Sequence, residues 1–133
     1  MTEHFTCQHL PSGIHQLTLH DGSREAYEQC FAYLDKIFAG SSPKEPLLLL
    51  SLVHEFDVQR VSDLWRLSRK LLIKHPQKRP LFNAVVYDSS ASFSLLLTAM
   101  SQLASIFGAR IHFCSHDKQE EAVAWLIDTG HSL

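Results

Sequence analysis

The residues best suited to chemistry stand together at Asp88, Ser89 and Ser90. They follow the apolar run Leu81–Tyr87, which predicts a buried strand, and they precede an apolar helix expected over residues 91–107. In α/β proteins, functional groups gather where a strand's carboxyl end faces a helix amino terminus. Two interpretations stay open. The three side chains cap the helix, or the turn docks a partner or accepts a phosphate, which the helix dipole would stabilise.

Catalysis lacks support in this sequence. A nucleophilic serine needs a neighbouring base, and no histidine lies close to Ser89 or Ser90. There is no Gly-x-Ser-x-Gly elbow, no glycine-rich phosphate loop and no paired ligand spacing. We therefore expect a protein without enzymatic activity and without a cofactor.

His112, Cys114 and His116 alternate along the last expected strand, so they share one face if that strand reaches His116. Imidazole and thiolate groups are zinc ligands, but the usual paired spacings are missing. We interpret them as partly exposed polar residues of an edge strand and predict no metal site.

Basic residues concentrate between Arg60 and Arg79, where the only acid is Asp63. The segment is either a solvated helix face or a surface for anions, such as acidic lipid headgroups or an acidic protein. The candidate residues for anion binding are Arg66, Arg69, Lys70 and Lys74. The whole chain has a net charge of −2 and contains no base-reading motif, which argues against sequence-specific nucleic-acid binding.

The expected elements form one domain over residues 1–133. A hairpin around Pro11-Ser12-Gly13 comes first, and helices and strands then alternate. The expected helices cover about 26–38, 61–72 and 91–107 and the segment around 122–126; the later strands are Leu47–Val53, Leu81–Tyr87 and 110–114. This order predicts an α/β fold of four βα units with a mostly parallel sheet and an antiparallel amino-terminal edge strand.

The helix over 91–107 is apolar nearly all round, so we expect it to be sandwiched between other elements. Any side left uncovered would form a homodimer interface or an apolar ligand pocket. Apolar runs are too short to span a bilayer. Three scattered cysteines without a secretory signal favour a cytoplasmic protein with reduced thiols.

Two stretches carry a resemblance to a known family. Arg110-Ile111-His112-Phe113-Cys114, with Glu120-Glu121-Ala122-Val123-Ala124-Trp125-Leu126, resembles the closing strand and helix of the SpoIIAA-like family. That family is related to the STAS domains of anti-sigma-factor antagonists and anion-transporter tails. Asp88-Ser89-Ser90 resembles the antagonists' Asp-Ser-Ser-Gly turn, with Ala91 in place of the glycine. The resemblance implies that Ser90 is the residue phosphorylated by a partner kinase.

The leading hypothesis is a non-catalytic, regulatory protein-interaction module. Its surface would combine Asp88, Ser89 and Ser90 with Glu55 and Asp57, because both loops follow parallel strands and lie at one end of the sheet. The alternative is a carrier of a small apolar or lipid-like ligand beneath the helix over 91–107. The resemblance supports that alternative through a fold kinship with CRAL-TRIO lipid carriers. An enclosed, ligand-sized apolar cavity would favour the carrier, and a closed core would favour the module.

Overall fold

The computed structural model describes residues 3–42, 44–77, 79–87 and 92–131, without the side chains of Ser92 and His131. The strands are β1 (Phe5–His9), β2 (Ile14–Leu19), β3 (Leu47–Val53), β4 (Leu81–Tyr87) and β5 (Arg110–Ser115). The α-helices are α1 (Arg24–Gly40), α2 (Val61–Lys74), α3 (Ser92–Phe107) and α4 (Gln119–His131). Two short 3₁₀ helices, η1 (Val58–Arg60) and η2 (His116–Lys118), precede α2 and α4.

The five strands form one sheet in the order β1-β2-β3-β4-β5. β1 runs antiparallel to β2 at the edge, with Phe5 opposite Leu19, and the remaining pairs are parallel. The predicted α/β class and the antiparallel amino-terminal edge strand are therefore confirmed.

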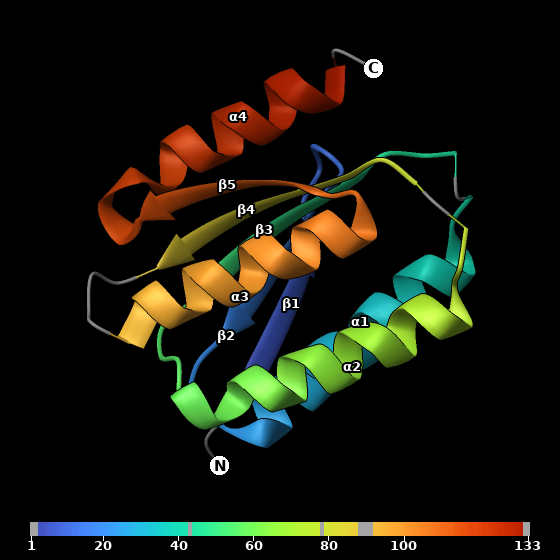
Figure 1. Cartoon of the computed structure of the whole chain (residues 1–133). Helices are drawn as coiled ribbons and strands as arrows, with labels where there is room; N and C mark the ends of the chain where they lie inside the picture. The colour runs from blue at the N-terminus through green and yellow to red at the C-terminus, as the bar shows by residue number, and fades with distance from the viewer. Residues whose placement is uncertain (1–2, 43, 78, 88–91, 132–133) are drawn as a thin grey trace.

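The helices divide unequally between the two faces of the sheet (Figure 1). α1, α2 and α3 cover one face, and α4 alone packs on the other. Side chains alternate along a strand, so the apolar run of β3 supplies both layers. Leu49 and Val53 pack beneath the three helices, and Leu50 packs with Ala122 and Leu126 of α4.

Local signals in the sequence set several helix ends. Ser23 caps α1 by accepting a 3.2 Å hydrogen bond from the backbone N–H of Ala26. Gly108, with φ of 68°, follows the last residue of α3, as a helix terminator commonly does. Asp57 caps η1 by accepting a hydrogen bond from the backbone N–H of Gln59. Asp117 lies within η2 and accepts a hydrogen bond from the hydroxyl of Ser115.

The expectation that α3 is sandwiched is wrong. Leu96 and Leu103 are buried against the sheet, but Leu95 is 46% exposed and Ile106 is 48% exposed. α3 is the last helix on its face, because the chain crosses to the opposite face after β5 (Figure 1). One flank of this apolar helix consequently meets solvent. Within the described residues, none of the helices has both the length and the hydrophobicity to traverse a bilayer.

Candidate functional site

Asp88, Ser89, Ser90 and Ala91 lie outside the described residues, so the predicted docking or phosphoacceptor turn stays a prediction. β4 ends at Tyr87, whose register partner is Val53 at the end of β3. The loop that contains Glu55 and Asp57 therefore begins beside the end of β4.

That loop is anchored by one aromatic side chain. Phe56 is 6% exposed and meets the ring of Tyr27 edge-on at 6.3 Å, while Glu55 and Asp57 are exposed on either side. The loop also touches the turn after β2: a Cβ added at Gly22 would lie 3.0 Å from the backbone nitrogen of Asp57. Both predicted carboxylates consequently project to solvent from a fixed loop.

The same edge carries three neighbouring histidines that the sequence pattern did not reveal. The backbone N–H of His20 donates to the carbonyl of His4 at 3.0 Å, and that of His54 donates to Leu19 at 3.1 Å. The rings of His20 and His54 stack with centroids 5.8 Å apart. His4 immediately precedes β1, whereas His20 and His54 immediately follow β2 and β3, and their proximity can be inferred only once the strand register is known.

The residue types of a hydrolase triad lie close together at His4, Asp21 and Ser23. Asp21 Oδ2 lies 2.6 Å from His4 Nδ1, and Ser23 Oγ lies 3.3 Å from the same nitrogen. A triad requires the carboxylate and the serine on opposite ring nitrogens. The hydrogen bonds of Ser23 and His4 hold the pKa of Asp21 below its usual value. The cluster therefore fixes the start of α1, with Ser23 as its cap, and lacks the geometry of a nucleophilic site.

The zinc interpretation of the last strand finds no geometric support. The ring of His112 stacks on Trp125 at 5.1 Å, Cys114 is 4% exposed beneath α4, and His116 lies in η2 beyond the strand. Burial raises the pKa of the Cys114 thiol, which disfavours the thiolate that a metal needs. No group of three or more His, Cys, Asp or Glu residues within the described parts of the chain could hold a metal ion.

Several residues of the basic segment have structural roles. Asp63, 4% exposed, accepts from Arg60 at 2.7 Å, Arg24 at 3.3 Å and Arg66 at 3.3 Å. Burial acts to raise the pKa of Asp63, but the hydrogen bonds of Arg66 and Arg24 and the nearby positive charges outweigh it and lower that pKa. This cluster ties the beginning of α2 to α1.

The carboxyl end of α2 is fixed in a similar way. Asp35 of α1 lies 2.8 Å from Lys74 Nζ and 2.6 Å from His75 Nε2. Hydrogen bonds from Lys74 and His75 lower the pKa of Asp35. Lys74, one of the predicted anion-binding residues, is thus already paired.

The other three candidates are more accessible. Arg69 and Lys70 are exposed, and neither has an ionic or hydrogen-bond partner in the part of the chain that the structure describes. Arg66 has a side chain 53% exposed, with Glu28 4.0 Å away in addition to Asp63. These three side chains, called here the basic rim, lie on α2 beside a groove.

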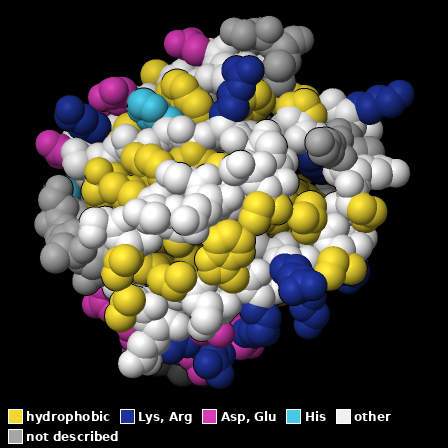
Figure 2. All heavy atoms as spheres, in the orientation of Figure 1, with side chains coloured by type: hydrophobic (Ala, Val, Ile, Leu, Met, Phe, Trp, Pro, Cys, Tyr) yellow, Lys and Arg dark blue, Asp and Glu magenta, His cyan; other side chains and the backbone are white. Residues whose placement is uncertain are grey.

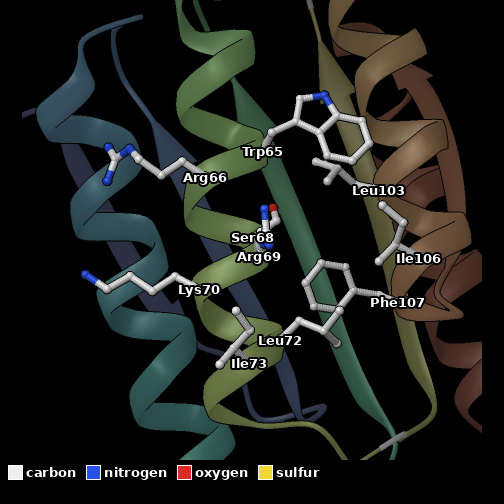
Figure 3. Close-up of a pocket in the computed structure, with 10 residues that line it drawn as sticks. All are labelled: Trp65, Arg66, Ser68, Arg69, Lys70, Leu72, Ile73, Leu103, Ile106 and Phe107. Atoms are coloured by element: carbon white, nitrogen blue, oxygen red, sulfur yellow. The ribbon is translucent and has the colours of Figure 1, made fainter.

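The groove runs between α2 and α3, has a volume of about 740 Å³ and is open to solvent. Figure 3 shows Trp65 and Leu72 of α2 on the side of α2 that faces Leu103 and Phe107 of α3. Ile73 and Ile106 also line it and are 70% and 48% exposed. Two aromatic residues, Trp65 and Phe107, thus line a surface groove.

The charged side chains that line this groove all belong to α2. In Figure 3 Arg66 and Lys70 extend from α2 toward α1, away from the apolar side chains. α3 has no charged residue anywhere between Ser92 and Phe107. Figure 2 shows the result: hydrophobic side chains along the furrow between the two helices, and Lys and Arg side chains gathered beside α2.

The space beneath the helices is small. Two interior spaces of about 90 and 70 Å³ lie between the helices and the sheet, both lined in part by Asn83. Ligand pockets usually measure about 300–1,000 Å³, so neither is an enclosed, ligand-sized cavity. The larger space shares Ser68, Leu103 and Phe107 with the groove.

Comparison with family models, curated proteins and solved structures found no match to this chain. The resemblance to the SpoIIAA-like family therefore rests on the motifs of the sequence, and the site must be interpreted from its own geometry.

Proposed function

We propose that this chain is a non-catalytic protein-interaction module that docks an amphipathic helix of a partner protein in the groove between α2 and α3. The observation that carries the proposal is the open apolar groove of about 740 Å³ between two parallel crossover helices, with Ile73 and Ile106 exposed at its borders. Burying an apolar helix face in such a groove is a recurring mode of peptide recognition.

The composition of the groove suits a protein partner. Trp65 and Phe107 supply large, half-buried aromatic surfaces, the kind of residue that contributes most to binding energy at interfaces. Ile73 leaves most of its side chain in water, so its burial by a partner is favourable at about 25 cal/mol per Å² of apolar surface.

A second copy of the chain fits the groove less well. A two-fold contact places the same surface patch on both subunits. Arg69 and Lys70 of one copy would then approach those of the other, and α3 offers no carboxylate to offset the repulsion. The homodimer expectation therefore ranks below a partner of different composition.

One observation favours the carrier as a second candidate. The interior space of about 90 Å³ shares Ser68, Leu103 and Phe107 with the groove. An apolar tail lying in the groove could extend toward that space, with its head group near the basic rim. This candidate requires a ligand that co-purifies with the protein and leaves it on denaturation.

The test compares exposed apolar residues inside and outside the groove. A partner isolated from the source cells is identified, produced separately and titrated against Ile73→Glu and Ile106→Glu. Val58→Glu and Leu95→Glu are matched controls, because these side chains are 54% and 46% exposed and do not line the groove.

We expect each groove variant to weaken binding at least tenfold and each control to change it less than twofold. Unchanged binding in both groove variants would refute the docking site. If the isolation yields a bound lipid and no protein partner, the result would favour the carrier function.

A further inference from the structure

The groove has two unlike flanks, and this asymmetry constrains what it binds. On the α2 side, Arg69 and Lys70 have no partner among the described residues, and Arg66 keeps half of its side chain in water. On the α3 side, every residue from Ser92 to Phe107 is uncharged. The positive field is therefore strongest over one flank of the groove.

A helix that docks its apolar stripe into the groove presents one polar flank to each of these sides. Acidic residues over the basic rim would gain Coulomb energy, and basic residues there would be repelled. Over α3 a charged residue would meet only uncharged side chains, where partial desolvation costs energy without a compensating charge.

We infer that the partner helix is acidic on the flank that lies over α2 and uncharged on the flank that lies over α3. This inference rests on the proposed function. A single face of acidic residues beside the apolar stripe also fixes the helix's rotation in the groove.

The recessed aromatic residues favour a helix over a membrane surface. An anionic bilayer would satisfy the basic rim and could take up the exposed tips of Ile73 and Ile106. Trp65, Leu103 and Phe107 line the groove between the two helices, where a convex occupant reaches them more readily than a flat surface does (Figure 3).

The experiment is a selection from a displayed library of helical peptides. The members share one apolar stripe at positions i, i+3, i+4 and i+7, and the two polar flanks are randomised. The library is selected in parallel on the wild-type chain and on the Arg69→Glu/Lys70→Glu double variant. Circular dichroism and thermal unfolding confirm that the double variant is folded.

On the wild-type chain, we expect enrichment of Asp and Glu on one flank and of uncharged residues on the other. On the double variant, the same flank should become enriched in Lys and Arg. Selected acidic peptides should lose affinity at least tenfold against Ile73→Glu and keep it against Leu95→Glu. In a Trp125→Phe background, leaving Trp65 as the remaining tryptophan, they should shift the emission of Trp65.

The experiment distinguishes failure of the acidic-flank inference from failure of the proposed docking groove. Peptides that bind in the groove without a charge preference, or with the same preference on both proteins, would overturn the acidic flank and leave the docking groove in place. Peptides insensitive to Ile73→Glu, or a selection that yields no binder, would overturn the groove itself. If binding appears only with vesicles containing phosphatidylserine and not with phosphatidylcholine alone, the surface recognises membranes and both proposals fail.

Discussion

The hydroxyl of Ser51 donates a 2.8 Å hydrogen bond to the side-chain oxygen of Asn83, on adjacent strands beneath the helices. Both side chains are buried among apolar residues, at 7% and 8% exposure. A polar pair in such surroundings stabilises the fold only while each partner is satisfied.

Ser51→Ala removes this donor and leaves the Asn83 oxygen without it. We expect a loss of about 1–3 kcal/mol in the free energy of unfolding. Urea denaturation measures it, with Ser101→Ala as a control, since the Ser101 side chain is exposed on α3. A loss no greater than that of the control would mean that water or a rotated amide replaces the bond.

Asp63→Asn removes the negative charge of the carboxylate that accepts hydrogen bonds from Arg24, Arg60 and Arg66. We expect destabilisation of about 2 kcal/mol at pH 7, reduced because two of the three arginines are more than half exposed. The pKa of Asp63 is lowered in the fold, so its contribution is present above the ordinary value of 3.8 and is lost as the pH falls through the folded pKa. Wild type and variant should therefore converge in stability under acid; equal differences at pH 7 and pH 3 would contradict the assignment.

Two glycines provide an opposed pair of substitutions. At Gly22 a methyl group would lie 3.0 Å from the backbone nitrogen of Asp57, so Gly22→Ala should cost about 1–3 kcal/mol through overpacking. Gly40 closes α1 with no atom within 4 Å of an added Cβ, so Gly40→Ala should be neutral or stabilise by up to about 1 kcal/mol. Gly22→Ala should lower the thermal unfolding temperature and Gly40→Ala should leave it unchanged or raise it; a lowered temperature in Gly40→Ala would contradict this account.

His15 should make the fold less stable in mild acid. Its pKa is lowered by burial, by His9, whose ring stacks on it at 4.2 Å, and by the charge of Arg79; Tyr33 OH lies 2.9 Å from its Nδ1. The unfolded state binds the proton more readily, so stability is lost as the pH falls below 6.5. Urea midpoints at pH 7.5 and 5.5 should differ less in His15→Gln than in wild type. His54→Gln, on an exposed loop, is the control, and an unchanged pH dependence in His15→Gln would refute the role.

Phosphorylation of Ser90 remains a prediction from the sequence. If Ser90 is the acceptor, protein purified from its own host should include a species heavier by one phosphate, and peptide mass spectrometry should place that phosphate on Ser90. Ser90→Ala should abolish this species, and Ser89→Ala should retain it. Unmodified protein from every growth condition would remove the switch from the proposal.

The sequence predicted the strands well where both faces are covered. Leu47–Val53 and Leu81–Tyr87 have the expected bounds, because a continuous apolar run between turn residues allows few alternatives. The environment of α3 was predicted incorrectly, because composition does not show that the layer of helices ends there. The groove and the histidines at His4, His20 and His54 depend on helix spacing and strand register, which no local pattern contains.

The order of the strands in the sheet matches their order along the chain, and this has a consequence during synthesis. A nascent chain can extend the sheet one strand at a time, because each new strand pairs with the one made just before it. Among the elements that the structure describes, α4 comes last and is the helix that covers Leu50, Phe82 and Val86. Until α4 leaves the ribosome, these side chains form a bare apolar surface, so the growing chain is most prone to aggregation, and most dependent on chaperones, between the synthesis of β5 and that of α4.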